Sequence, residues 1–442
     1  MKEFLPFLIG IMLSTTSALV NADDLVQIYE QAKRSDPLLL QAIAKRDEAF
    51  TAINASRSVI LPQINLNAGF NLNLNSKASI TSDLSNTNSL NVGIALNQEL
   101  FNRNSWINLD IAEITARKED AVYAMQQQKL ILRVFQAYFH VLRTIDGLTL
   151  ISAEKVAVGR QLVQMRQRFK VGLSAITDVH NAQAQYDSVL AREILSENEV
   201  LNSYEEVHEI TGQVHTKLNV LNTKSFSASQ PKQSLNALLE QAKEKNLNLL
   251  VSRISRDIAK ERISLAKSSH LPLLTLSTGY DLLDQKNRSN STRDIDYNQL
   301  SVGIKLVVPL YSGGRIDASV KKAQFNYVAI SESLQSIYRS TMKNVRASYN
   351  NINASIGTLR AYGQTVVSQN SALEVTKAGF AVGTCTIVDV LVATRRLYDA
   401  NRNLSNARYD YILNTLKLRE AVGTLSEQDL IDINQGLILP KK

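Results

Sequence analysis

The chain carries one long pattern twice, at an offset of about 210 residues. The segment VGIALNQELF, Val92 to Phe101, returns as VGIKLVVPLY, Val302 to Tyr311. The segment FKVGLSAITDV, which begins at Phe169, returns as FAVGTCTIVDV, which begins at Phe380. A solenoid needs three or more short units. Two long copies instead predict a duplicated half-structure with pseudo-twofold symmetry.

The first 22 residues have the pattern of a secretory signal peptide. Lys2 precedes an apolar run from Phe4 to Leu13, and small residues lead to Ala22, which predicts cleavage before Asp23. A membrane anchor is the alternative, but the run is too short to span a bilayer as a helix. We therefore expect the mature chain to lie outside the cytoplasm. Cys385 is the only cysteine, which excludes an internal disulfide framework.

Charge and motif content argue against nucleic-acid binding and catalysis. The net charge is +8, but Lys and Arg are scattered among acidic residues along helical faces, as on solvated helices. The five histidines are dispersed, without acidic or cysteine partners at metal-ligand spacing. The sequence has no phosphate-binding glycine loop and no nucleophile constellation. It predicts no enzyme, no cofactor and no metal site.

Four segments alternate between apolar and polar residues. From Ile64 to Leu74 the alternation has no exception, which predicts a strand with one apolar and one polar face. The same period recurs over residues 90–96, 274–282 and 300–306. Each run approaches the roughly 9 to 11 residues that a tilted strand needs to cross a bilayer. A soluble sandwich would alternate in the same way, but only four strands accompany several hundred helical residues.

Four strands cannot close a barrel, and lipid does not tolerate an open sheet edge. Two chains would supply eight strands, whose side chains nearly fill the lumen, whereas three would supply twelve and leave an aqueous passage. The sequence thus favours a homotrimer. We expect aromatic belts at Phe101, Trp106 and Tyr311, and outward-facing loops at Ser76 to Ser89 and Lys286 to Asp296.

The remaining sequence favours very long helices. No Pro lies between Pro62 and Pro231 or between Pro309 and Pro440. The helix-compatible stretch from Ser105 to Lys170 would be a rod on the order of 100 Å. Apolar residues at spacings of three and four form a coiled-coil seam there: Ile131, Val134, Tyr138, Val141, Ile145 and Leu148. These patterns predict a mixed α/β membrane protein in which antiparallel coiled coils, joined at two Val-Gly turns, accompany a transmembrane β-barrel.

Two segments carry a family resemblance. Residues Phe380 to Leu425, and RFKVGLSAITDVHNAQAQYDSV from Arg168, resemble the TolC family of outer-membrane efflux proteins. The resemblance implies a homotrimer whose twelve-stranded β-barrel in the outer-membrane lipid continues as an α-helical barrel across the periplasm. It further implies an exit duct that serves proton-driven or ATP-driven inner-membrane pumps, including type I protein secretion and multidrug export. A periplasmic adaptor protein would connect the duct to the pump.

These features divide the chain into nine expected segments. They are the signal peptide, 1–22; helices of repeat 1, 23–61; the first β-hairpin, 62–104; a long helix, turn and returning helix, 105–215; an equatorial linker, 216–245; a helix of repeat 2, 246–270; the second β-hairpin, 271–312; a second long helix, turn and returning helix, 313–423; and an equatorial segment with the tail, 424–442.

The two Val-Gly turns are the first candidate site. Glycine commonly closes the last turn of a helix, which explains both glycines without any function. The resemblance adds that adaptor hairpins dock at these turns. The docking residues would be Val171, Gly172, Leu173, Val382, Gly383 and Thr384.

The resemblance also implies a periplasmic entrance gate. Thr177 and Asp178 match the family's partners in the first copy, but Phe380 and Cys385 stand where the family has Tyr and Arg. Val392 replaces a second acidic residue. A charge-assisted hydrogen bond contributes about 1.5 to 3 kcal/mol. We therefore expect a weaker latch, or one made by other residues.

Asp389 and Asp178 occupy equivalent positions in the two copies. Thr386-x-x-Asp389 fits a helix-capping box, and a capping carboxylate can also face a lumen, so both roles stay open. Six such carboxylates in a trimer would form a cation-selective constriction. Their crowding would raise some pKa values and make conductance change in mild acid.

A structural alternative is a trimeric coiled-coil surface protein without transport activity. It explains the heptads but not the strands or the duplication. Within the duct hypothesis, the sequence does not separate drug efflux from polypeptide secretion.

Overall fold

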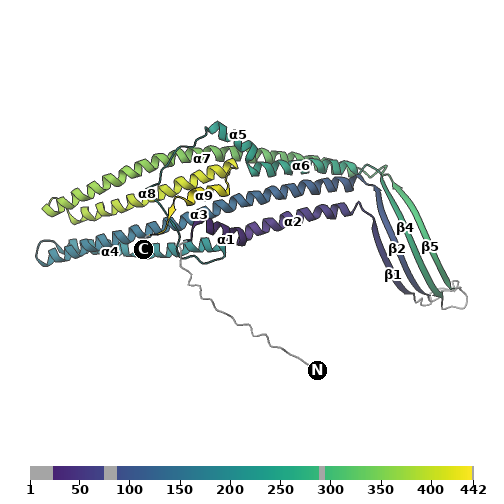
Figure 1. Ribbon diagram of the computed structural model, residues 1–442, viewed down its shortest axis with the longest axis horizontal. Coiled ribbons are helices and arrows are strands. Elements are labelled where there is room, and N and C mark those ends of the chain that lie inside the picture. The colour runs from purple at the N-terminus through teal and green to yellow at the C-terminus, as the bar shows by residue number, and fades with distance from the viewer. Residues whose placement is uncertain (1–22, 74–86, 288–293, 441–442) are drawn as a thin grey trace, which may run out of the picture.

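The computed structural model describes residues 23–73, 87–287 and 294–440. The molecule is elongated: a long layer of helices continues at one end into four strands (Figure 1). The predicted signal peptide and most of the two predicted outward loops lie outside the described residues.

The four predicted strands form one antiparallel sheet in the order β1-β2-β4-β5. They are β1 (Gln63–Asn73), β2 (Thr87–Phe101), β4 (Leu273–Asn287) and β5 (Ile295–Val307). The predicted loops were too long, because β2 already begins at Thr87 and β4 continues to Asn287. The hydrogen bonds between strands join backbone N–H and C=O groups and need no apolar side chain. The strands therefore continue through polar residues that interrupt the apolar–polar alternation. β1 and β5 are the edges of this sheet.

Helices of equal length recur in the same order. They are α2 (Pro37–Ser58) and α6 (Leu247–Ser268), with 22 residues each; α3 (Arg103–Lys170) and α7 (Arg315–Val382), with 68 each; and α4 (Ile176–Thr211) and α8 (Ile387–Val422), with 36 each. At about 1.5 Å per residue, α3 and α7 are each about 100 Å long. α3 begins at Arg103 rather than at the predicted Ser105, because the Asn102 side chain accepts a hydrogen bond from the Asn104 N–H. Among the described residues, none of the helices has an apolar stretch that would cross a membrane.

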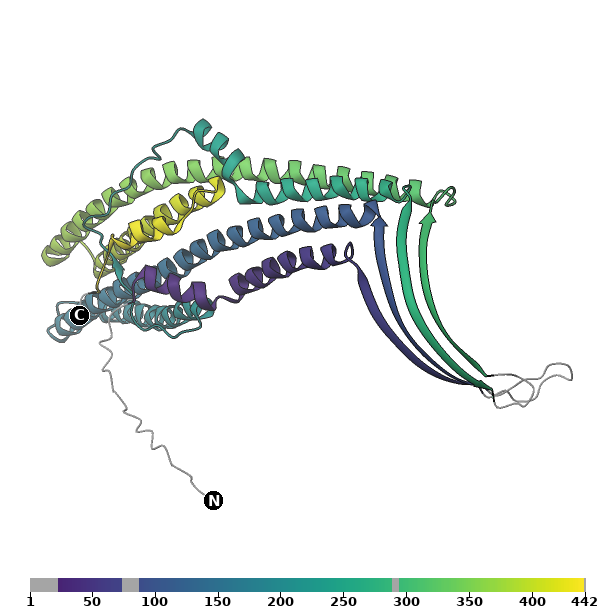
Figure 2. The same ribbon diagram turned by 45° about the vertical axis from the view of Figure 1, so that its right-hand side comes forward.

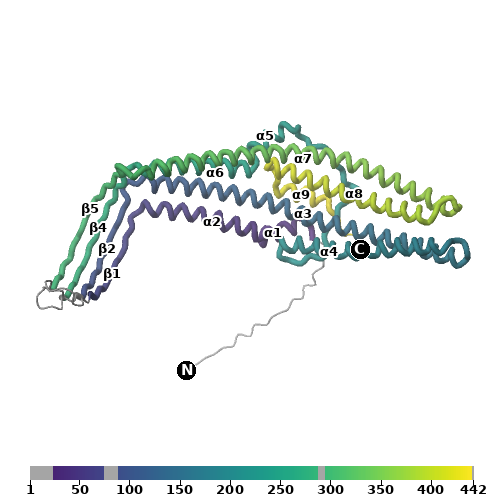
Figure 3. Tube along the Cα trace, turned by 180° about the vertical axis from the view of Figure 1, so that it is seen from behind, coloured from purple at the N-terminus to yellow at the C-terminus, as the bar shows by residue number. Residues whose placement is uncertain are grey.

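The helices form a single curved layer with two edges. Away from the sheet, α4 packs on α3, α3 on α8 and α8 on α7 (Figures 1 and 3). Nearer the sheet, the order is α2, α3, α6 and α7. α4 and α7 are therefore the edges of the layer at the end far from the strands.

Short elements surround the middle of the layer (Figure 2). They are α1 (Leu25–Ser35), β3 (Val220–Leu221), α5 (Leu235–Lys245), α9 (Glu427–Asn434) and β6 (Leu437–Ile438). β3 and β6 pair antiparallel, which joins residues far apart in the sequence. The main core lies beneath them, where Phe135, Tyr138, Phe139 and Tyr409 are buried.

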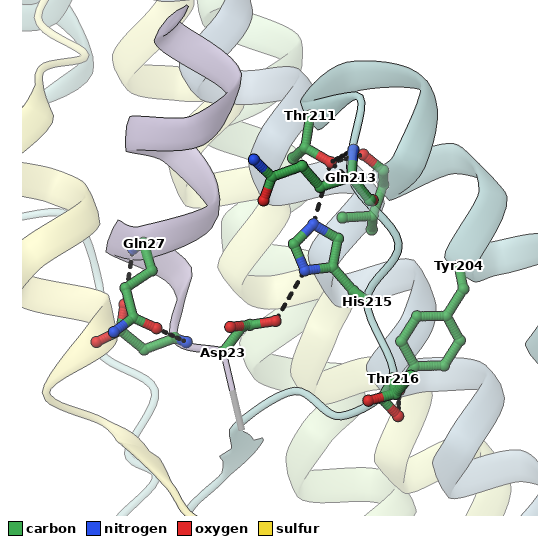
Figure 4. A network of polar contacts seen from close by, with 9 residues as sticks. Asp23, Gln27, Tyr204, Thr211, Gln213, His215 and Thr216 are labelled. Carbon is green, nitrogen blue, oxygen red and sulfur yellow. Dashed lines mark hydrogen bonds and ion pairs between the residues drawn. The ribbon is translucent and has the colours of Figure 1, made fainter. Parts of the chain in front are cut away.

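A buried histidine fixes the first described residue to this middle region (Figure 4). His215 lies 2.8 Å from an Asp23 carboxylate oxygen through Nδ1 and 3.0 Å from the Thr211 hydroxyl through Nε2. The Asp23 N–H donates to the Lys217 carbonyl at 2.9 Å. This network holds the start of α1 against the chain that leaves α4.

Candidate functional site at the ends of the long helices

The first turn, between α3 and α4, is closed by backbone hydrogen bonds around Gly172. Gly172 has φ of +77°, the Leu173 N–H donates to the Arg168 carbonyl at 2.8 Å, and the Gly172 N–H donates to the Phe169 carbonyl at 3.0 Å. This left-handed conformation costs other L-residues about 1 to 2 kcal/mol. Val171 and Leu173 are exposed. The glycine is thus required by the backbone, while its neighbours present apolar surface.

The second turn, between α7 and α8, has the same geometry. Gly383 has φ of +84°, and the Thr384 N–H donates to the Gly379 carbonyl at 2.9 Å. Val382 is exposed, as Val171 is in the first turn. Cys385 is half-buried, and its Sγ would lie 2.7 Å from a Cβ placed on Gly379. The cysteine therefore fills the space that Gly379 leaves.

Thr386 caps α8 and Asp389 completes the capping box, as predicted. The Asp389 carboxylate accepts hydrogen bonds from the Thr386 hydroxyl at 2.7 Å and the Thr386 N–H at 2.8 Å, and the Asp389 N–H donates to the Thr386 hydroxyl at 3.2 Å. These hydrogen bonds favour the ionised carboxylate and lower the pKa of Asp389. Within one chain the pKa of Asp389 is therefore lowered. This is opposite to the rise in pKa that we expected from the crowding of carboxylates in a trimer.

Asp178 has the corresponding place at the start of α4. Its carboxylate accepts hydrogen bonds from the Ser174 hydroxyl at 3.1 Å and the Ala175 N–H at 3.3 Å. Ala175 has no side-chain oxygen to cap the helix, so the carboxylate supplies the local partner. Thr177 beside it is exposed.

The two hairpins meet at a contact that sequence reasoning missed. The Arg168 guanidinium carbon lies 4.8 Å from the centre of the Phe380 ring, which joins the last turn of α3 to the last turn of α7. In the described chain, no hydrogen bond joins Thr177 or Asp178 to Phe380 or Cys385. No local signal in the sequence pointed to this pair, because Arg168 and Phe380 lie 212 positions apart, although each is within four residues of a turn glycine.

An apolar cluster supports this contact. Phe380 packs against a buried apolar cluster whose members come from α3, α4, α7 and α8, among them Met165, Ala182 and Ile387. Further from the turns, the Gln161 amide donates to the Thr394 hydroxyl at 3.0 Å and ties α3 to α8. The Arg168–Phe380 contact is thus the outermost of several contacts between the hairpins. No cluster of His, Cys, Asp or Glu suited to a metal ion occurs in the described residues.

The sequence profile of the family described as outer membrane efflux protein matches residues 28–213 and 238–424. The chain belongs to this family. An outer membrane protein TolC of Vibrio cholerae is 57% identical to this chain over 443 residues. The alignment covers 100% of this chain and 100% of that relative. A proteases secretion protein, PrtF of Dickeya chrysanthemi, is 26% identical over 96% of this chain and 94% of its own length.

A solved structure has the same fold as this member of the outer membrane efflux protein family. The CmeC outer membrane channel of Campylobacter jejuni aligns with a TM-score of 0.79 at 15% identity, over 93% of this chain and 89% of CmeC. The fold is therefore that of TolC-type channels.

Proposed function

We propose that the protein is an outer-membrane duct through which substrates leave the cell in efflux and in type I protein secretion. The observation that carries this proposal is the full-length similarity to TolC of Vibrio cholerae, together with membership of an efflux family. The similarity to PrtF supports the secretion role. No observation favours the alternative of a structural surface protein without transport activity.

The duct is a homotrimer with a shared barrel in the lipid of the outer membrane. Every residue of β1 and β5, the edges of the sheet, is exposed in the single chain. Alternate residues on these edges, such as Leu66 and Leu300, are apolar and suit contact with lipid. Because lipid cannot satisfy open edges, copies must pair β5 of one with β1 of the next. Three copies would give twelve strands and an aqueous passage.

The far ends of the helices are the periplasmic entrance. Two exposed apolar turns suit contact with a periplasmic adaptor protein: Val171, Gly172 and Leu173 in the first, and Val382, Gly383 and Thr384 in the second. Arg168 stacked on Phe380 supplies a latch between the hairpins where the family pattern has other groups. Asp178 and Asp389, with Thr177 and Cys385 nearby, line the entrance. The duct is passive and not an enzyme, so energy comes from an inner-membrane pump.

Export by cells tests this proposal. Cells that lack the gene should become sensitive to pump substrates or lose a secreted protein, and the wild-type gene should restore both functions. A matched control is the gene with its signal segment deleted, which should restore neither. Normal export of pump substrates and of secreted proteins in the deletion strain would contradict the proposal.

A further inference from the structure

Two adjacent arginines on α8 have no charged partner. Arg395 and Arg396 are exposed, and neither forms an ion pair with any residue that the structure describes. The equivalent positions of the first copy, on α4, are Ala184 and Gln185. The returning helix of a hairpin therefore does not need arginine at these positions.

The acidic residues near these arginines already have other partners. The Tyr398 hydroxyl donates to the Ala153 carbonyl at 3.2 Å, which places this part of α8 beside Glu154 of α3. Three nearby ion pairs have N···O distances of 2.9, 2.7 and 3.0 Å: Asp399–Arg402, Glu154–Arg192 and Glu374–Lys377. The two arginines are thus an excess of positive charge in this part of the helical layer.

Tyr411 marks the face of α8 that another part of the chain covers. Its ring packs edge-on against Phe226, with 5.9 Å between ring centres, and its hydroxyl forms two hydrogen bonds of 2.9 Å with the Ser229 backbone. Both partners lie in segment 222–234, which links β3 to α5. A helix turns about 100° per residue, so Arg395, 16 residues before Tyr411, lies about 160° from that face. Arg395 therefore points away from the covering segment.

A polar groove between α7 and α8 lies on the side of Arg396. Arg396 precedes Asn403 by seven residues, so both lie on one side of α8. The carboxylate in the groove, Asp410, pairs with Arg143 of α3. The other polar residues of the groove are neutral: Asn351, Ser355, Thr358, Tyr362, Asn403, Asn406 and Asn414. Arg396 thus continues a neutral polar groove toward the turns.

The uncovered face would line the lumen of the proposed duct. Segment 222–234 would obstruct a passage, so the face that it covers belongs on the outside. Three copies with two arginines each would then place six positive charges around the lumen. Asp389 precedes Arg396 by seven residues on the same side of α8, about 10 Å along the axis. The lumen would therefore carry negative charge near the turns and positive charge two helical turns further in.

We propose that Arg395 and Arg396 form an anion-binding ring in the lumen, and that the duct conducts organic anions such as carboxylates and sulfonates. This inference rests on the duct proposed above and adds a substrate class to it. A guanidinium donates paired hydrogen bonds to the oxygens of such anions. Like charges that line a narrow passage also raise the local concentration of counter-ions. Carboxylates at the entrance would by themselves favour cations.

Block of single channels by hexacyanoferrate(III), a trivalent anion, tests the ring. The anion is added on the outer side, so that it reaches the arginines without first passing Asp389. The variant combines Arg395→Ala with Arg396→Gln, which places the residues of the first copy in the second. Its block should be about tenfold weaker than that of the wild type. Block by multivalent cations from the periplasmic side should persist, because Asp389 is unchanged.

Two further variants separate lumenal charge from other effects of substitution. Arg395→Lys combined with Arg396→Lys keeps the charge and should keep most of the anion block. Arg408→Gln removes an arginine three residues before Tyr411, about 60° from the covered face, and should leave the block unchanged. Equal block of the wild type and the Ala/Gln variant would overturn the ring, and so would an equal loss in Arg408→Gln.

A measurement on the wild-type channel tests the ring without any substitution. Block by hexacyanoferrate(III) should tighten when KCl is lowered from about 1 M to about 0.1 M, because salt screens the arginines. A wild-type channel that conducts but is not blocked, or whose block does not change with salt, would overturn the anion ring and leave the duct standing. An inserted oligomer that conducts no ions would contradict the duct itself.

Discussion

Replacing Gly383 with Arg should abolish export while leaving the oligomer in the membrane. Gly383 lies in an exposed turn with φ of +84°, and no atom lies within 4 Å of a Cβ placed there. The arginine would therefore project from the turn, where we expect the adaptor to dock. Loss of a central interface contact commonly reduces binding by about 2 to 4 kcal/mol, or roughly 30-fold to 1000-fold. Export of a pump substrate by complemented cells measures the effect.

The control for Gly383→Arg must separate charge from backbone strain. Gly383→Asn keeps a residue that tolerates the left-handed conformation but adds no charge. It should export at nearly the wild-type rate, with the same amount of membrane oligomer. Gly172→Arg should behave like Gly383→Arg if both turns dock adaptor hairpins. Normal export by Gly383→Arg in assembled oligomers would remove the second turn from the docking site.

Replacing Arg168 with Ala should open the entrance. Each Arg168–Phe380 contact contributes about 0.5 to 1 kcal/mol, so three copies acting together contribute about 1.5 to 3 kcal/mol. The ratio of open to closed ducts should rise roughly tenfold to a hundredfold. Passive uptake of a large antibiotic that the outer membrane normally excludes measures this change in cells without an active pump.

Three variants identify the physical cause of any opening. Phe380→Leu keeps apolar volume but removes the ring, so it should open the entrance as Arg168→Ala does. Phe380→Tyr keeps the ring and should stay closed. Cys385→Arg adds a guanidinium beside the second turn and should reduce uptake below the wild-type level. The latch hypothesis would be wrong if Arg168→Ala and Phe380→Leu both left uptake unchanged.

The existence and order of the strands and long helices were predictable, because both depend on the periodicity of apolar residues along the sequence. Alternation from Ile64 to Leu74 predicted β1, and the absence of Pro predicted helices that reach from the strands to the turns. The strand ends were less predictable, because polar residues such as Asn88 continue the backbone ladder. No local sequence pattern indicates which helices pack together in the layer. Nor does any local pattern indicate which strand pairs with β3. β3 and β6 lie more than 200 residues apart and meet only through packing.

The candidate site was predictable only in part. Thr386 and Asp389 form a local capping box, which is encoded within four residues and was found. The stacking of Arg168 on Phe380 joins residues 212 positions apart, so no short motif encodes it. The similar role of Asp178 was hidden because Ala175 is not a capping residue. In both turns, local geometry could be derived from sequence, and contacts between the hairpins could not.

The most direct test of the central claim is single-channel conductance of the purified wild-type protein in planar bilayers, with multivalent cations added on the periplasmic side. We expect steps of one uniform size that these cations block. Because the capping hydrogen bonds lower the pKa of Asp389 below its ordinary value, its carboxylate should remain ionised at pH 5 and the block should persist there. The block should weaken only when the pH falls through this lowered pKa of Asp389. A verified, inserted oligomer that conducts no ions would contradict the duct.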